Sequence, residues 1–171
     1  MRWVWIDRFT AFEPGQAATA VKCLSHAEGH YVEHFPGYPV MPAALILEGL
    51  AQTGGILVGE ANDFREKVVL AKIPSAKFHR DAVPGEMLTY AVRMLDLKPQ
   101  GAVVGGRVTC GDELVAEAEI FFAHLDQNRS QQTFGDHNFV FGGELQYLLG
   151  MAKQAVKPAE LLPAVVEEKQ D

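Results

Sequence analysis

The segment PAALILEGLAQTGGILVGE, residues 42–60, decides the fold, because a helix with this sequence is apolar on nearly every side. Pro42 stands where a helix favours proline, at the start, since the missing N–H would have no helical partner there. A helix that is apolar nearly all round must be buried on most sides. We therefore predict a central helix over residues 43–60, covered by the rest of the chain.

Strand patterns lie on both sides of this helix. Two runs rich in Val, Ile, Trp, Phe and Thr precede it at residues 3–12 and 16–25, with a turn between them. Four further strand candidates follow it, separated by turns that contain glycine, at residues 67–79, 86–97, 102–110 and 113–124. This order predicts a sheet that curls around the buried helix.

Composition limits the class of protein. The chain has 171 residues, of which 48% are hydrophobic and 22% charged, as in an ordinary globular domain. Its net charge of -7 argues against nucleic acid as the main partner. The two cysteines, Cys23 and Cys110, lack a zinc or redox spacing. Since neither a signal peptide nor a membrane span is recognisable, we expect a cytoplasmic protein without a membrane partner, a metal or another cofactor.

The composition changes near residue 125. We expect one domain over residues 1–125 and a C-terminal extension over residues 126–171, helical in 143–156. The extension is polar at its start and at its end, with a glycine-rich stretch between. Two interpretations stay open for it, a partly ordered appendage or a packed functional cap.

Two polar side chains interrupt the apolar helix, Glu48 and Gln52, which share a face because they are four residues apart. A carboxyl group among apolar residues costs free energy unless it is paired or protonated, so Glu48 is predicted to be a buried acid that donates a proton. The alternative is a Glu48 that points to solvent. His34 precedes the helix in a proline-rich loop, and its imidazole is a natural general base near neutral pH.

Other features of this segment fit the same chemistry. The amides of Ala43 and Ala44 are the first free N–H groups of the helix, suited to negative charge on a carbonyl oxygen. Gly49 and Gly54 leave little side-chain bulk, so we expect them to line an apolar channel. A base, a buried acid and amide donors together indicate proton abstraction beside a carbonyl, with loss of a leaving group.

Residues 34–52, HFPGYPVMPAALILEGLAQ, closely resemble the pattern H-F-P-G-x-P-x-x-P-G-x-L-x-x-E-x-x-A-Q of the FabZ-type 3-hydroxyacyl-[acyl-carrier-protein] dehydratases. The similarity continues over most of residues 4–124. It implies an α+β hotdog fold, an antiparallel β-sheet wrapped around a long central helix. The related FabA type is less similar, because it carries Asp at the position of Glu48.

The resemblance also implies a reaction, the dehydration of (3R)-3-hydroxyacyl thioesters of acyl carrier protein to trans-2-enoyl thioesters in fatty-acid biosynthesis. His34 would take the proton from Cα and Glu48 would protonate the departing hydroxyl. The amides of Gly37 and Ala43 would polarise the thioester, and substrate binding would extend to Gln52 and Gly54. The partners implied are acyl carrier protein and a second copy of the chain, in a homodimer or a trimer of dimers. His34 of one subunit would work with Glu48 of its mate.

The sequence departs from the family pattern at several places. Ala43 and Glu33 each stand where the family has glycine. The family's N-terminal helix has no counterpart before the first predicted strand, so we expect residues 126–171 to cover what that helix covers. A non-catalytic acyl-thioester binding protein and a hotdog thioesterase remain alternatives. The joint presence of His34 and Glu48 favours the enzyme over a binding protein.

Two further patterns have less specific interpretations. His26, His30 and His34 recur every four residues, as metal ligands on a helix would, but Gly29 and the prolines after His34 argue against a continuous helix. Residues 65–80 form a basic run, either a solvated face or a docking surface for an acidic carrier protein. Its basic members are Arg65, Lys67, Lys72, Lys77 and Arg80.

Overall fold

The computed structural model describes residues 4–125, 147, 149 and 150. Within these residues, six strands form one antiparallel sheet in the order β1-β2-β4-β5-β6-β3. The strands are β1 (Arg8–Glu13), β2 (Ala17–Cys23), β3 (Lys67–Phe78), β4 (Met87–Lys98), β5 (Gly101–Cys110) and β6 (Glu113–Leu125). Two helices lie between β2 and β3 in the chain, α1 (His30–Glu33) and α2 (Ala43–Glu60).

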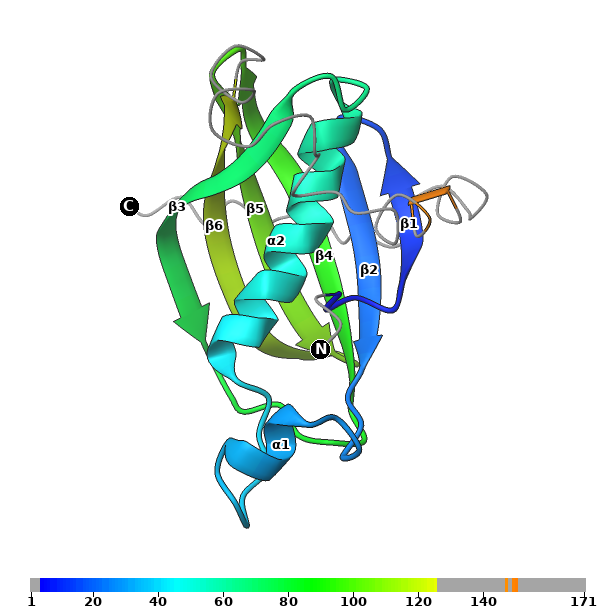
Figure 1. Cartoon of the computed structure of the whole chain (residues 1–171), viewed down its shortest axis with the longest axis vertical. Helices are drawn as coiled ribbons and strands as arrows, with labels where there is room; N and C mark the ends of the chain where they lie inside the picture. Colours follow the sequence, from blue (N-terminus) through cyan, green and yellow to red (C-terminus); the bar gives the residue numbers. More distant parts are fainter. Residues whose placement is uncertain (1–3, 126–146, 148, 151–171) are drawn as a thin grey trace.

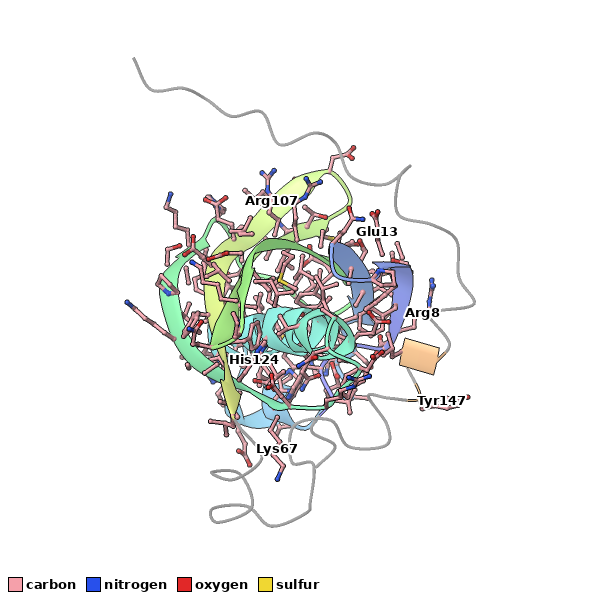
Figure 2. The ribbon with its side chains drawn as sticks, turned by 90° about the horizontal axis from the view of Figure 1, so that it is seen from above. Arg8, Glu13, Lys67, Arg107, His124 and Tyr147 are labelled. Atoms are coloured by element: carbon pink, nitrogen blue, oxygen red, sulfur yellow. The ribbon has the colours of Figure 1, made fainter. Side chains whose placement is uncertain are left out.

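The sheet curves around α2, as the sequence predicts. In Figure 1 the helix lies across the concave face of the sheet, and Figure 2 looks down on it with strands on several sides. Of its 18 residues, 12 are buried. The predicted central helix and the α+β hotdog fold are therefore confirmed. None of the described helices is long and apolar enough to cross a membrane.

Two glycines let α2 lie directly on the sheet. A Cβ atom at Gly49 would lie 2.5 Å from Cζ of Tyr90. At Gly54 a Cβ atom would lie 3.2 Å from Val104 and 3.3 Å from Phe122. Sheet side chains thus fill the space directly over these two glycines, where the small residues serve close helix–sheet packing, and a channel along Gly49 and Gly54 stays a prediction.

The first strand begins later than predicted, at Arg8. The chain before it contacts the helix instead, since the backbone N–H of Trp5 donates a 2.8 Å hydrogen bond to Oε1 of Gln52. Asp7 then joins the sheet edge through a 2.7 Å hydrogen bond from its N–H to the carbonyl of Val21. The other five strands begin and end within two residues of the predicted ranges, and α2 has the predicted bounds.

Most of the helix predicted for residues 143–156 lies outside the described residues. Tyr147, Leu149 and Gly150 are described and are helical. Leu149 is 4% exposed and belongs to the hydrophobic core. Figures 1 and 2 both show this short piece beside β1. One residue of the extension therefore contributes to the core, and the role of the remainder stays a prediction.

Candidate active site

His34 stands where the chain turns sharply between the two helices. It caps the C-terminus of α1, and its N–H donates a 2.9 Å hydrogen bond to the carbonyl of His30. The next residue, Phe35, has a φ of 57°, in the left-handed region that side chains other than glycine rarely adopt. This conformation costs about 1 kcal/mol, and such strain is concentrated at functional sites. The reversal of chain direction directly after His34 therefore requires a strained backbone at Phe35.

Glu48 lies in the second turn of α2 and is half-buried in the single chain, between the two alternatives that the sequence left open. Nε2 of Gln52 donates a 2.9 Å hydrogen bond to Oε1 of Glu48. Oε1 of Gln52 in turn accepts the N–H of Trp5, so the orientation of the carboxamide is fixed. Because an amide nitrogen only donates, Oε1 of Glu48 must accept. A proton on this carboxyl group therefore resides on Oε2.

Gln52 links Glu48 to the chain segment before β1. Gln52 is 7% exposed, and its carboxamide is hydrogen-bonded to Glu48 and to the backbone of Trp5. Sequence reasoning grouped Gln52 with the substrate-binding residues and missed Trp5 altogether. No side-chain pattern could have found Trp5, because the donor is a backbone N–H.

Gly37 and Ala43 are both exposed residues. Within the described part of the chain, neither N–H has a hydrogen-bond acceptor. Ala43 is the first residue of α2 and does not have a positive φ, so its methyl group imposes no backbone strain where the family pattern has glycine. Both amides are therefore available to a carbonyl oxygen.

His34 and Glu48 do not contact each other through a hydrogen bond or an ion pair in the single chain, among the residues that are described. The structure brings Glu48 and Gln52 together and places His34 on the preceding loop. An acid–base pair made of both residues therefore needs a substrate between them, or a second copy of the chain.

His30 is half-buried and packs against two aromatic rings. Its ring centroid lies 5.4 Å from that of Trp5 and 4.1 Å from that of Tyr31. Burial lowers the pKa of His30, and the charges of Lys22 and His34 lower it further, whereas the charge of Glu28 raises it.

The described residues contain no cluster of three or more His, Cys, Asp or Glu side chains that could hold a metal ion.

A groove of about 940 Å³ lies elsewhere, on the outer face of the sheet. Thr89, Ala91 and Arg93 line it, and along β4 they alternate with the buried residues Leu88, Tyr90 and Val92. Arg107, another lining residue, points away from the helix in Figure 2. The predicted site residues are all absent from the described lining. This groove is therefore separate from the candidate active site.

Solved structures of the same architecture include enzymes of more than one kind. A dehydratase heterocomplex from Xenorhabdus doucetiae matches with a TM-score of 0.63 at 12% identity, covering 76% of this chain and 88% of that one. A mutant thioesterase from Pseudomonas aeruginosa matches with a TM-score of 0.58 at 17% identity, covering 69% and 80%. These likenesses define a hotdog-fold protein and do not by themselves decide the reaction.

Sequence comparison is more specific. A family model for the FabA-like domain matches residues 2–119. The FabZ 3-hydroxyacyl-[acyl-carrier-protein] dehydratase of Pelotomaculum thermopropionicum is 40% identical over 119 residues, 69% of this chain and 85% of the relative. That of Symbiobacterium thermophilum is 41% identical over 122 residues, 71% and 86% of the two chains. The chain belongs to the FabA-like family and, within it, to the FabZ-type dehydratases.

Proposed function

We propose that this chain removes water from (3R)-3-hydroxyacyl thioesters of acyl carrier protein in fatty-acid biosynthesis, giving trans-2-enoyl thioesters. The observation that carries the proposal is the fixed carboxyl group of Glu48. Gln52 occupies its Oε1, so Oε2 is the oxygen that remains for a substrate. Such an arrangement suits a general acid, and it lies within the segment that matches the dehydratase pattern.

In the proposed mechanism, His34 takes the proton from Cα of the substrate while the amides of Gly37 and Ala43 bind the thioester oxygen, on which negative charge develops. The bond between C3 and the hydroxyl oxygen then breaks, and Oε2 of Glu48 gives its proton to that oxygen, which leaves as water. The electron pair of the former C–H bond becomes the double bond. Return of the proton from His34 to Glu48 restores the starting state.

The proposed assembly is a homodimer, or a trimer of such dimers, with each site shared between two copies. The edge strand β3 supports it, because this strand of 12 residues pairs with β6 on one side only. Leu70 and Phe78 on β3 are 44% and 43% exposed. A long, partly apolar edge strand tends to pair with another chain unless it is protected. In the shared site, His34 of one copy would work with Glu48 of the other.

Acyl carrier protein is the proposed carrier of the substrate. Ion pairs engage several members of the basic run at residues 65–80: Lys77 lies 3.7 Å from Glu117, and Arg80 lies 2.9 Å from Glu86. Lys72 is exposed and has no ion pair among the described residues. We assign the docking contribution of this run to Lys72, since a solvated ammonium group best attracts an acidic protein.

The direct test is turnover by the full chain. The absorbance of the conjugated enoyl thioester, formed from a (3R)-3-hydroxyacyl-carrier protein, should rise in the presence of the wild type. General acid–base groups contribute about 100- to 10,000-fold, so His34→Asn and Glu48→Gln should each lose at least about 100-fold in kcat. Glu33→Gln is the matched control, because this neighbour of His34 is exposed. Release of free carrier thiol instead of enoyl product would favour the thioesterase, and binding without turnover would favour the non-catalytic protein.

A further inference from the structure

A lysine is buried beneath the segment that carries His34. Lys22, near the end of β2, has a side chain only 10% exposed. Its ammonium nitrogen lies 2.7 Å from Oε1 of Glu28, 3.3 Å from Oδ1 of Asp7 and 3.2 Å from the carbonyl oxygen of Cys23. Three acceptors thus meet the three N–H donors of an ammonium group. Burial alone lowers the pKa of Lys22, but the hydrogen bond to Glu28 and the charges of Asp7 and Glu28 outweigh it and raise the pKa.

Glu28 links this lysine to the turn before α1. Its Oε1 contacts Lys22, and its Oε2 accepts a 3.2 Å hydrogen bond from the N–H of Ser25. Its carbonyl oxygen accepts a 3.2 Å hydrogen bond from the N–H of Tyr31, in the first turn of α1. The carbonyl oxygen of His30 in α1 then accepts the N–H of His34. A continuous set of contacts therefore runs from β2 through Glu28 to His34.

The helix α1 needs such contacts to exist. It has four residues and no side-chain cap at its N-terminus. A helix this short is not stable in isolation, because a single turn does not offset the entropy of ordering its backbone. Its other anchors are the contact of His30 with Trp5 and the side chain of Tyr31, which is 3% exposed and whose hydroxyl donates a 3.8 Å hydrogen bond to Sδ of Met41. The ion pair with Lys22 adds a charged contact that joins the turn before α1 to the sheet.

We propose that the ion pair of the buried Lys22 with the half-buried Glu28 is a positioning element for His34, acting through α1 and not on the substrate. This inference rests on the proposed role of His34 as the base. Asp7 completes the cluster by holding the end of β2: its Oδ2 accepts a 2.6 Å hydrogen bond from the N–H of Cys23. The lysine is thereby held on the sheet, and Glu28 holds the loop against it.

The test is Glu28→Gln in the full chain, which keeps the shape of the side chain and removes its charge. A misplacement of about 1 Å costs on the order of 100-fold in rate. We expect kcat to fall by about 10- to 100-fold, with KM within about threefold of the wild type, since substrate contacts are unchanged. The matched control is Lys98→Met, which removes an exposed lysine paired with Asp96 and should leave both constants unchanged.

A second variant covers the case in which Glu28→Gln does not fold. Glu28→Asp keeps the charge but withdraws the carboxylate by one methylene group, so it cannot reach both Lys22 and Ser25; kcat should fall at least about fivefold at constant KM. A folded variant of either kind with wild-type kcat overturns the positioning role, as does a loss confined to KM. His34→Asn distinguishes failure of the proposed function from failure of this inference. If His34→Asn stays active, the proposed function is wrong. If His34→Asn is inactive but Glu28→Gln is fully active, only the positioning role of Lys22 and Glu28 is wrong.

Discussion

Gln52 offers a sharp prediction, because one side chain serves both stability and the orientation of the proposed acid. Gln52→Leu removes two hydrogen bonds, the one accepted from the buried N–H of Trp5 and the one donated to Glu48. An orphaned buried N–H costs about 1–3 kcal/mol. At roughly 2–4 °C per kcal/mol for a domain of this size, the melting temperature should fall by about 2–12 °C.

The effect on activity follows from the second bond. Glu48 becomes a carboxylate as it gives up its proton, and a hydrogen bond to a charged group contributes about 1.5–3 kcal/mol. If this bond holds the carboxyl group of Glu48 in the productive orientation, its loss should reduce kcat by about 10- to 150-fold, since 1.36 kcal/mol corresponds to a tenfold change in rate. The assay is enoyl thioester formation at saturating substrate, carried out below the melting temperature of the variant.

Gln52→Glu separates the two roles of this residue. An acid of the same shape still accepts the N–H of Trp5, so the melting temperature should change less than in Gln52→Leu. The donor that faced Glu48 becomes a second carboxyl group, and two neighbouring carboxyl groups retain a shared proton to higher pH. The alkaline limb of the kcat profile should therefore move upward. A stable Gln52→Leu with wild-type kcat, or an unshifted profile in Gln52→Glu, would refute the reasoning.

Three other substitutions test separate parts of the structure. Gly49→Ala should lower stability by about 1–2 kcal/mol in thermal denaturation, because overpacking against Tyr90 exceeds the gain in helix propensity; unchanged stability would contradict the packing. Burial alone raises the pKa of Glu86, but its hydrogen bond and ion pair with Arg80 lower it below 4.5. Glu86→Gln should therefore lower the free energy of unfolding by about 1–2 kcal/mol at neutral pH, and this difference from the wild type should disappear as the pH falls through the lowered pKa. A difference in the free energy of unfolding that stays constant in acid would exclude this explanation. Lys72→Glu should raise KM about three- to tenfold for substrates on carrier protein and leave KM for a small thioester unchanged; equal effects on both would remove the docking role.

Much of the fold could be predicted because the sequence patterns that indicate its helix and strands are local. The apolar run after Pro42 identifies α2, and turns that contain glycine separate the strands, so most boundaries agree within two residues. The predicted start of the first strand is wrong because the residues before Arg8 have the composition of a strand, whereas the backbone of Trp5 is hydrogen-bonded to Gln52 of α2. Such a contact joins positions 47 residues apart and leaves no local pattern.

The sequence nominates residues for the candidate site but does not predict their geometry. His34 and Glu48 stand out from a proline-rich loop and an apolar helix, and the family pattern reinforces them. The glycines are ambiguous in the sequence, since a small residue fits both an open channel and close packing; the position of Tyr90 shows close packing directly over Gly49. Lys22 was overlooked, although a lysine inside an otherwise apolar strand is itself a signal of a buried ion pair.

We propose that His34 and Glu48 form one acid–base site across two copies of the chain. The test is to unfold and refold His34→Ala and Glu48→Ala together in equal amounts; each variant alone should be nearly inactive. If pairing is random, about half of the dimers are hybrids, and each hybrid has one intact site and one doubly damaged site. Roughly a quarter of wild-type dehydration activity should therefore return in the refolded mixture. A mixture that stays inactive, although hybrids are shown to form by differential tagging, would contradict the shared site.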